Sequence, residues 1–396
     1  MYQLKYNIMP IIYQILISTL LAFLGTLWIH PKILKIAIAK NLVDNPDARK
    51  LQRRPIPNMG GPAVFFGITI GLCCSQIVLN SPNIFMLILA MLIILYIGIM
   101  DDILGLTPTI RFVIEILIVC WLMYVNNASI NCFYDLWGIN VFSGWISYPL
   151  TILACVGIIN AINLIDGVNG LSSGFCFMAS VVFAIMFYHM GNMAMMTIAL
   201  SAAGAIIPFF LHNVFGYNTR MFIGDSGTLV VGTMMSMFVI SILDANLSST
   251  SMMLKGVGLI PFTIAVLSIP VFDTVRVMST RILHKKSPFN PDKTHLHHMF
   301  IDLGFSHIGT TISILCLNFI IIASWFVAYK LGASIETQLY IVLALGVIFT
   351  FGFYNFSKRQ IEKNGKILRF LQSIGKCMNF EKKGIWSIIQ KSIDKL

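Results

Sequence analysis

The sequence predicts an all-α polytopic membrane protein with about eleven transmembrane helices and an amphipathic cytoplasmic tail. Three observations predict this fold class. Of the 396 residues, 57% are hydrophobic and only 11% are charged, whereas a soluble domain carries roughly 25% charged residues. The apolar residues are grouped in segments of ~20, the length that spans a bilayer. The basic residues gather in alternate loops between these segments.

Each expected span is a mostly apolar segment between polar loops. The first segment ends at Trp28-Ile-His-Pro31 without a small-residue cleavage site, which indicates an anchor rather than a removed signal peptide. We expect the spans at residues 10–29, 60–79, 84–100, 111–126, 146–162, 171–190, 194–212, 227–243, 258–279, 311–330 and 338–356.

The distribution of Lys and Arg predicts the orientation. Of 27 such residues, 24 lie in alternate loops or after residue 357. By the positive-inside rule these loops and the C-terminus lie in the cytoplasm, and the N-terminus lies outside. The net charge of +11 then reflects topology and attraction to the anionic inner leaflet, and it does not indicate nucleic-acid binding.

The first cytoplasmic loop contains a cluster of cations. Arg49, Lys50, Arg53 and Arg54 precede a turn that ends in Gly60-Gly61. An ordinary positive-inside cluster explains this charge. The functional alternative is a phosphate-binding loop beside the bilayer, in which the two glycines let the backbone approach a ligand.

Two adjacent carboxylates end the third expected span. Asp101 and Asp102 repel each other and lose hydration there, so they stay ionised only beside a compensating cation. Arg111 or a divalent metal would supply that charge. Helix capping accounts for one of the two carboxylates but not for both.

The stretch Asn160-Ala-Ile-Asn-Leu-Ile-Asp-Gly-Val-Asn-Gly-Leu171 places polar groups between two apolar spans. An ionisable residue at this depth is seldom without function. Asn163 and Asp166 are three residues apart, which places them on one helix face, and Gly167 and Gly170 permit the turn that ends the helix. A helix cap at the membrane interface is the structural alternative.

Another acidic motif, Gly224-Asp-Ser-Gly227, lies at the start of the span at 227–243. The pattern also suggests a serine protease, but no soluble β-barrel sequence surrounds it. Asp225, flanked by glycine at a helix start, suits a metal-bound phosphate. Helix capping is again the alternative.

Histidines are concentrated at the end of the largest cytoplasmic loop, which also contains Arg281. His295, His297 and His298 have Arg, Lys and Pro neighbours and no obvious fourth metal ligand. Such surroundings favour an anionic group, with the imidazole N–H groups as donors. Zinc binding is the alternative.

Two segments carry no expected chemistry. The alternation around Gly138 in residues 127–147 favours a small β-hairpin. The tail at 357–396, separate from the transmembrane domain at 1–356, carries ten cations against three acids. We expect it to form amphipathic helices on anionic lipid, with apolar faces formed by Ile367, Leu368, Leu371, Ile374, Ile385, Trp386, Ile389 and Ile393.

All five polar clusters fall on the predicted cytoplasmic side. Carboxylates beside a phosphate-rich ligand call for Mg²⁺, and the surrounding Arg and His suit a pyrophosphate transition state. The residues therefore predict metal-dependent phosphoryl or phosphosugar transfer to a lipid, at an active site on the cytoplasmic face. The competing classes are a transporter, which would place polar residues near span centres and on both sides, and a lipid-binding scaffold, which needs no set of four carboxylates.

The motifs resemble those of the polyprenyl-phosphate N-acetylhexosamine-1-phosphate transferases. The resemblance covers about residues 40–310 and rests on five motifs in order, among them Asp101-Asp102, the Asn160–Leu171 stretch, Phe222-Ile-Gly-Asp-Ser-Gly227 and Ser287–His298. The Pro-Asp-x-x-His-x-His-His form resembles the bacterial branch that uses UDP-N-acetylglucosamine and undecaprenyl phosphate. It is less similar to the branch that uses UDP-N-acetylmuramoyl-pentapeptide.

The resemblance implies a multi-pass enzyme of the bacterial inner membrane that transfers N-acetylglucosamine 1-phosphate to undecaprenyl phosphate and releases UMP. It implies Mg²⁺ as cofactor, with Mn²⁺ as a substitute, and the first membrane step of a cell-surface glycan pathway. Another UDP-N-acetylhexosamine is the alternative donor. A one-step attack by the lipid phosphate and a two-step path through an Asp nucleophile both stay open, as does a homodimer.

The resemblance also implies roles for single residues. Asp225 would bind Mg²⁺ with Asn163 as a second ligand, and Asp101 would deprotonate or position the lipid phosphate, with Asp102 supporting the metal and the charge balance. Other residues would bind the nucleotide, the phosphates and the sugar: Asp166 and Asn169 for the nucleotide, Arg111 and Arg281 for the phosphates, and His295 to His298 for the pyrophosphate and sugar. Many bacterial members have Asp where Asn169 stands, so an amide contact to uracil is the expected role there. Thr228, where Ser is common, is a minor departure.

Overall fold

The protein is a bundle of helices in which two short hairpins are the only described β-structure. The computed structural model describes residues 8–46, 54–81, 84–245, 256–287, 293–380 and 384–395. The all-α membrane fold class predicted from the sequence is confirmed. Within the described residues, nine helices are long and apolar enough to span a membrane, and a bent pair of helices makes up to ten.

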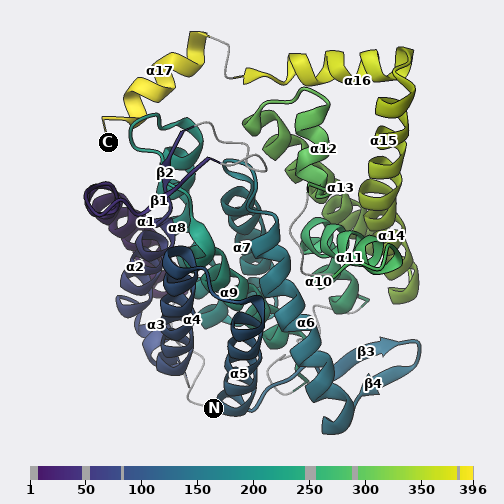
Figure 1. Cartoon of the computed structure of the whole chain (residues 1–396). Helices are drawn as coiled ribbons and strands as arrows, with labels where there is room; N and C mark the ends of the chain where they lie inside the picture. Colours follow the sequence, from purple (N-terminus) through teal and green to yellow (C-terminus); the bar gives the residue numbers. More distant parts are fainter. Residues whose placement is uncertain are drawn as a thin grey trace, which may run out of the picture.

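The first half of the bundle contains nine helices and both hairpins (Figure 1). These elements are α1 (Ile8–Ala39), β1 (Val43–Asp44), β2 (Ile56–Pro57), α2 (Gly60–Cys73), α3 (Gln76–Leu79), α4 (Ile84–Leu104), α5 (Pro108–Asn126), β3 (Cys132–Leu136), β4 (Ile139–Val141), α6 (Gly144–Leu164), α7 (Leu171–His189), α8 (Met193–Phe215) and α9 (Gly224–Leu243).

The second half is entirely helical where it is described. It contains α10 (Leu259–Val266), α11 (Ser268–Leu283), α12 (Leu296–Asp302), α13 (His307–Lys330), α14 (Ile335–Val347), a π-helical turn at Ile348–Gly352, α15 (Phe353–Lys363), α16 (Lys366–Cys377) and α17 (Gly384–Ile393). A helix occupies each of the eleven expected spans. The second span differs from the expectation, because its helix α2 has only 14 residues before the chain turns into α3.

Helix α9 is the centre of the bundle. It contacts α2, α4, α6, α7 and α10, and Asp225 is its one residue that is not buried. Small residues allow these close contacts. A Cβ atom on Gly232 would lie 2.9 Å from the Cα atom of Ile159 in α6, and one on Gly61 would lie 2.3 Å from the backbone nitrogen of Gly227. Gly60-Gly61 therefore brings α2 onto the start of α9, which differs from the expected approach of backbone to a ligand.

The ninth expected span, which contains Pro261 and Pro270, is formed by two helices, α10 and α11, with a bend of 74° between them. The side chain of Asn318 in α13 satisfies the backbone at this bend. Its Oδ1 atom accepts from the backbone nitrogen of Ile269 at 3.0 Å, and its Nδ2 atom donates to the carbonyl oxygen of Val266 at 3.0 Å. Buried backbone groups in a membrane need such partners.

The expected hairpin is confirmed as the antiparallel pair β3–β4, with Cys132 opposite Val141 and Leu136 opposite Ile139. Gly138 forms its turn with a φ angle of +72°. In Figure 1 this hairpin lies at one end of the bundle, whereas β1, β2, α12, α16 and α17 lie at the other end. The described residues of the polar clusters lie at this second end, where α4 and α6 end and α5 and α9 begin.

The tail forms helices as expected, but its apolar faces pack partly on the protein. Leu368 of α16 is buried against Met299 and Leu303. Trp386 of α17 is buried against Val214 and Ile308. Ile367, Ile374 and Ile389 are exposed as a lipid-facing side would require.

Candidate active site

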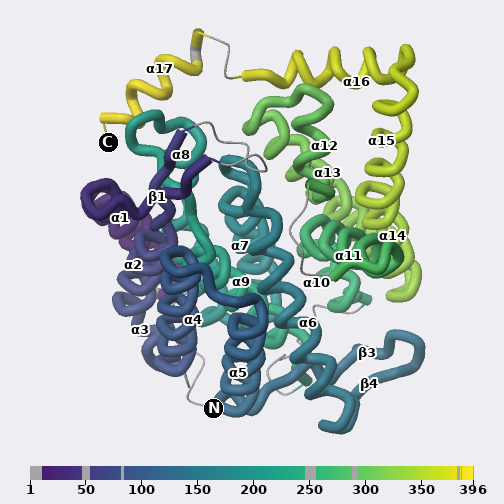
Figure 2. Tube along the Cα trace, viewed as in Figure 1, coloured from purple at the N-terminus to yellow at the C-terminus, as the bar shows by residue number. Residues whose placement is uncertain are grey.

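The site lies where four membrane helices end. The C-terminal end of α4, the first turn of α5, the last turn of α6 and the N-terminus of α9 meet here, and Figure 2 shows α4, α5 and α6 running beside one another toward this end. Helices α4 and α5 are joined by only three residues, so Asp101 and Arg111 face each other across a short turn.

Arg111 joins two carboxylates from different helices. Its Nη1 atom lies 3.1 Å from Oδ2 of Asp101 and 3.4 Å from Oδ2 of Asp225. Asp101 also accepts a hydrogen bond from the backbone nitrogen of Leu106 at 2.8 Å. The sequence left Arg111 and a divalent metal open as the compensating charge for the adjacent carboxylates. The structure places Arg111 beside Asp101, and the metal stays a prediction.

Asn163 completes the cluster around Asp225. Its Nδ2 atom donates to Oδ1 of Asp225 at 2.6 Å and to Oγ1 of Thr228 at 2.9 Å. About 35% of the Asp225 side chain is exposed. Asp225 is therefore held on one side by Asn163 and Arg111 and stays accessible on the other.

Asp102 caps helix α9. Its Oδ1 atom accepts from the backbone nitrogen of Asp225 at 2.9 Å and from Nδ2 of Asn58 at 2.8 Å, and its Oδ2 atom accepts from the backbone nitrogen of Ser226 at 3.1 Å. Free N–H groups and the dipole at a helix start favour such a carboxylate. The capping alternative thus accounts for one residue of the pair, and the supporting role of Asp102 at a metal stays a prediction.

A fifth carboxylate, Glu115, was not identified from the sequence. It is fully buried in α5. Its Oε1 atom lies 3.6 Å from Nε of Arg111, and its Oε2 atom accepts a hydrogen bond from Nδ2 of Asn160. The spacing of four residues after Arg111 in an apolar helix was the available signal.

Asp166 follows the last turn of α6. Ser172 donates from Oγ to its Oδ1 atom at 2.5 Å. Burial raises the pKa of Asp166 to about 7, an effect that the Ser172 hydrogen bond opposes and the charge of Asp225 reinforces. Gly170 has a φ angle of +78° and starts α7, as the turn predicted from the glycines requires.

Asn169 is buried beside the start of α13. Its backbone nitrogen donates to Nδ1 of His307 at 3.4 Å, and its carbonyl oxygen accepts from Oγ1 of Thr311 at 2.9 Å. These contacts fix the backbone. The contact of its side chain with uracil stays a prediction.

The histidine loop lies against the Asn160–Leu171 stretch. A Cβ atom on Gly167 would lie 2.1 Å from Nε2 of His297, so the glycine allows the two segments to touch. The His297 ring stacks on His295 with a centroid distance of 5.7 Å and lies 4.4 Å from that of His298. Burial lowers the pKa of His297 well below its ordinary value, and the neighbouring histidines lower it further.

Asp273 orients this loop, a role that was not identified from the sequence. Its Oδ2 atom lies 2.9 Å from Nδ1 of His295, and both its oxygen atoms accept from the backbone nitrogen of Leu296 at 3.2 Å. Arg276 lies 2.7 Å from its Oδ1 atom and donates to the carbonyl oxygen of Thr294 at 2.5 Å. With Nδ1 of His295 bound to Asp273, its Nε2 atom is the one left for a ligand.

The remaining predicted cations are distributed around the site. Arg54 donates to the carbonyl oxygen of Tyr217 at 2.6 Å and lies 4.0 Å above its ring centroid. Arg281 is buried in the last turn of α11. Arg53 lies outside the described residues, so its predicted role with phosphate is untested.

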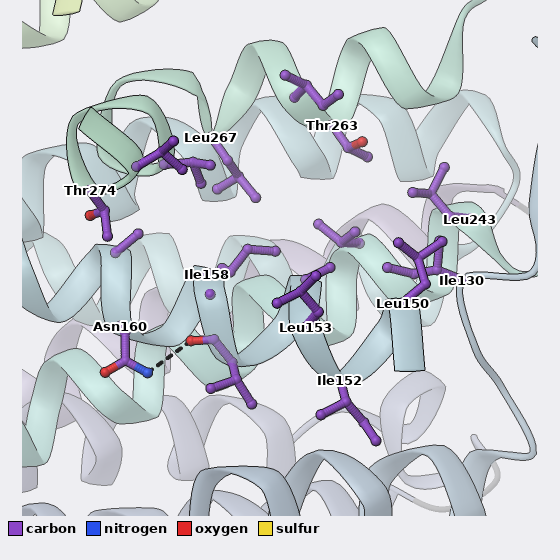
Figure 3. A pocket seen from close by; sticks show the side chains of 18 of the residues that line it. Ile130, Leu150, Ile152, Leu153, Ile158, Asn160, Leu243, Thr263, Leu267 and Thr274 are labelled. Carbon is purple, nitrogen blue, oxygen red and sulfur yellow. Dashed lines mark hydrogen bonds between the residues drawn. The ribbon is translucent and has the colours of Figure 1, made fainter. Parts of the chain in front are cut away.

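A long apolar cavity of about 940 Å³ lies beside the polar cluster, bordered by α6 and the bent pair α10–α11. Figure 3 shows Asn160 and Thr274 toward one end and Leu243 and Ile130 toward the other, with Leu153 and Ile158 between them. Asn160 belongs both to this cavity and to the Glu115 contact. The apolar part of a ligand bound in this cavity would therefore reach the polar cluster at Asn160.

The donor set suits a hard divalent cation that keeps other ligands. Within the described parts of the chain, no three His, Cys, Asp or Glu side chains are grouped closely enough to hold a metal alone. Mg²⁺ commonly takes one or two carboxylates and completes its shell with phosphate oxygens and water. Asp225, accessible and next to the amide of Asn163, fits that pattern.

Comparisons with known proteins point to one family. The family model described as glycosyl transferase family 4 matches residues 84–243. The chain is 32% identical over 336 residues to the probable undecaprenyl-phosphate N-acetylglucosaminyl 1-phosphate transferase of Bacillus subtilis (strain 168), covering 84% of this chain and 89% of that protein.

Two proteins named undecaprenyl-phosphate alpha-N-acetylglucosaminyl 1-phosphate transferase are more distant. The one from Salmonella typhi is 25% identical over 88% of this chain and 91% of its own length. The one from Escherichia coli (strain K12) is 25% identical over 86% and 89%, respectively. All three alignments cover more than four fifths of this chain.

Proposed function

Because the chain belongs to glycosyl transferase family 4, we propose that it transfers N-acetylglucosamine 1-phosphate from UDP-N-acetylglucosamine to undecaprenyl phosphate. One observation carries the proposal: Arg111 joins Asp101 and Asp225 at a membrane end that also borders an apolar cavity. A site of this kind brings a charged phosphate and a lipid chain to the same place. The names of the relatives support the same acceptor and sugar.

The transfer is a displacement at phosphorus. An oxygen of undecaprenyl phosphate attacks the β-phosphorus of the UDP-sugar and forms a new P–O–P bridge. The bond from that phosphorus to the oxygen of the α-phosphate breaks, and UMP leaves with the bonding electrons. The products are undecaprenyl-pyrophosphoryl-N-acetylglucosamine and UMP. The chain's carboxylates leave open a two-step path in which an Asp attacks first.

Arg111 and the histidine loop supply positive charge and donors for the phosphates. The equatorial oxygens of the β-phosphorus gain negative charge in the transition state. The N–H groups of the Arg111 guanidinium and of the imidazole rings would stabilise this charge. Asp101, paired with Arg111 at 3.1 Å, would orient the acceptor phosphate. Asp166 and Asn169, which follow the last turn of α6, would contact the nucleotide.

Asp225 would hold Mg²⁺, with the amide oxygen of Asn163 as second ligand and Asp102 balancing the charge. The ion would neutralise the pyrophosphate and thereby make UMP a better leaving group. Mn²⁺ has similar ligand preferences and would substitute.

The apolar cavity would take part of the polyprenyl chain. Its lining from α6, α9, α10 and α11 is almost entirely apolar, and Phe112 of α5 and Phe133 of β3 add aromatic rings, which suits an isoprenoid. Asn160 would then mark the point where the chain passes to its phosphate. The enzyme would face the bacterial cytoplasm, where nucleotide sugars are made, and would begin a cell-surface glycan.

The identity of the sugar is the most specific part of the proposal, and it can be tested directly. Membranes containing the protein are incubated with undecaprenyl phosphate and radiolabelled UDP-N-acetylglucosamine, another UDP-N-acetylhexosamine or UDP-N-acetylmuramoyl-pentapeptide. We expect lipid-linked label from UDP-N-acetylglucosamine, its loss with a chelator and its return with Mg²⁺ or Mn²⁺. Label from only one of the other donors would assign a different sugar, and no label from any donor would contradict the transferase.

A further inference from the structure

A carboxylate just after helix α17 binds the loop before α9. Asp394 follows α17, and its Oδ1 atom accepts from the backbone nitrogens of Tyr217 at 2.9 Å, Asn218 at 3.1 Å and Thr219 at 3.2 Å. The same oxygen accepts from Oγ1 of Thr219 at 2.9 Å. The Oδ2 atom accepts from the nitrogen of Asn218 at 3.3 Å. Four donor groups thus converge on one side chain.

Packing holds α17 in place for this contact. The Trp386 ring lies 5.0 Å from the ring of Phe215, the last residue of α8. Trp386 and Ile393 are both buried. The ring contact of Trp386 and the burial of Ile393 thus hold α17 beside the loop, so the contact of Asp394 is part of the folded protein.

The bound loop leads directly to the acidic cluster. Residues 216–223, which we call the 216–223 loop, connect α8 to Gly224 and Asp225. The backbone nitrogen of Phe222 donates to the carbonyl oxygen of Pro57 at 2.8 Å, and the nitrogens of Gly60 and Gly61 donate to the carbonyl oxygens of Phe222 and Ile223, each at 2.8 Å.

The segment that pairs with the loop also reaches Asp102. Arg54 donates to the carbonyl oxygen of Tyr217 at 2.6 Å, and four residues later Asn58 donates to Asp102 at 2.8 Å. Asp102 in turn caps the N–H groups of Asp225 and Ser226. A continuous set of hydrogen bonds therefore runs from the tail to the start of α9.

We propose that Asp394 is a positioning residue of the transfer reaction, which fixes the 216–223 loop and through it the placement of Asp225. The inference rests on the proposed function. The sequence indicated the basic tail only as a lipid-binding segment. The inference gives this tail an additional role in positioning the site.

The chemistry of the contact suits a permanent anchor. An ionised carboxylate binds backbone N–H groups more strongly than a neutral acceptor does. Desolvation of Asp394 raises its pKa, but the hydrogen bonds from Tyr217, Thr219 and Asn218 lower it more, so the net pKa is below its ordinary value. Asp394 therefore stays charged at neutral pH.

The test compares three variants with the wild type in detergent or nanodiscs. Asp394→Ala removes the acceptor, Asp394→Asn keeps one acceptor oxygen, and Glu362→Ala removes an exposed acid elsewhere in the tail. Small displacements of catalytic groups lower the rate steeply, so we expect kcat of Asp394→Ala to fall about tenfold with KM for UDP-N-acetylglucosamine nearly unchanged. We expect Asp394→Asn to recover most of the rate and Glu362→Ala to match the wild type.

Rates are expressed per folded molecule, counted by the monodisperse peak in size-exclusion chromatography. Equal kcat in Asp394→Ala and Glu362→Ala would overturn the inference, as would a change in KM alone or no recovery in Asp394→Asn. An inactive wild type would instead contradict the proposed function.

Hydrogen–deuterium exchange tests the contact without any activity. In Asp394→Ala, the amides of Tyr217, Asn218 and Thr219 should exchange faster than in the wild type and in Glu362→Ala, because they lose their acceptor. Exchange in β3–β4 at the opposite end should be unchanged. Unaltered exchange across residues 216–223 would refute the anchoring contact itself.

Discussion

Glu115 explains how Arg111 can serve two carboxylates at once. A guanidinium has five donors in a planar arrangement, and Glu115 lies 3.6 Å from its Nε atom while Asp101 and Asp225 lie near Nη1. The buried carboxylate thus lies at the Nε atom of the guanidinium and leaves Nη1 to Asp101 and Asp225. Glu115 positions Arg111 and need not touch a ligand.

Replacing Glu115 by Gln tests this role. The amide keeps an acceptor for Asn160 but loses the charge that orients Arg111, so we expect kcat to fall about tenfold. Glu336→Gln, beside the hairpin at the opposite end, is the matched control and should be fully active. A Glu115→Gln enzyme as active as that control would exclude the positioning role.

The buried carboxyl group of Asp166 should make the free energy of unfolding depend on pH. Its pKa is about 7 in the folded protein, raised from 3.8 by burial. A carboxyl with a raised pKa contributes stability that is fully present below the unfolded pKa and is lost as the pH rises through the folded pKa. The folded wild type should therefore lose stability as the pH rises from about 4 to about 7.

The Asp166→Asn variant removes this titration and keeps an acceptor for Ser172. Tm is followed by tryptophan fluorescence in detergent. The Tm of the variant minus the Tm of the wild type should be more positive at a pH near 7 than at a pH near 4. Glu362→Gln, an exposed substitution, should give the same difference from the wild type at both pH values. A constant difference for Asp166→Asn would show that the Asp166 carboxyl titrates as in the unfolded chain.

The polar residue types at the site are visible in the sequence, whereas several of their partners are not. Asp101, Arg111 and Asp225 stand out because charge at the end of an apolar span is costly. Asn58 binds Asp102, which is 44 positions away, and Asp273 binds His295, which is 22 positions away. No local sequence pattern indicates such pairs. The role of Asp102 as a cap for α9 likewise depends on the packing of α4 against α9.

At the scale of elements, the start of α9 depends on how closely Asp102 approaches it. Gly224 has a φ angle of +70°, and a Cβ atom on it would lie 2.5 Å from Oδ2 of Asp102. The sequence indicates a glycine-rich helix start here, but the reason for the glycine is the carboxylate from another helix. Only the packed structure reveals that contact.

Two glycine substitutions distinguish the effect of losing the close approach of Asp102 to Gly224 from the effect of backbone strain. Gly105 also has a positive φ angle, of +66°, but a Cβ atom on it would meet no other atom within 4 Å. Each Ala substitution should cost about 1 kcal/mol for the backbone conformation. Gly224→Ala should in addition displace Asp102, so it should lose most activity and folded yield while Gly105→Ala keeps both. Equal effects of the two substitutions would mean that the Asp102 cap is unimportant.

The tail shows where an amphipathic pattern is ambiguous. Helical spacing of Leu368, Trp386 and Ile393 correctly predicted helices with an apolar face. The same spacing serves a helix that lies on lipid and a helix that packs on protein. The structure buries these three side chains against the protein and leaves Ile367 and Ile389 on the exposed side.

At the scale of the whole molecule, the charges in the loops predicted which segments share an end of the bundle. The predicted cytoplasmic clusters do meet, through Arg111 and Asp225, through Gly167 and His297, and through Arg54 and Tyr217. Segment spacing alone could not place these pairs, because each joins different helices or loops. The side of the membrane that this end faces stays a prediction.

Thiol labelling tests the predicted orientation. Cys377, at the end of α16, is exposed at the end of the bundle that carries the site. A membrane-impermeant maleimide should label it in broken cells or inverted vesicles and not in intact cells, and Cys377→Ser should abolish that labelling. Labelling of Cys377 in intact cells would reverse the proposed topology.

We propose that the carboxylates around Arg111 support the transfer of a phosphosugar to a lipid phosphate. The most direct measurement follows UMP and undecaprenyl-pyrophosphoryl-N-acetylglucosamine in the same reaction, with purified wild type and Asp225→Asn. We expect equal amounts of both products from the wild type with Mg²⁺. We expect neither product from Asp225→Asn, although that variant should stay folded in the membrane. Full activity of Asp225→Asn, or UMP formed without the lipid product, would contradict it.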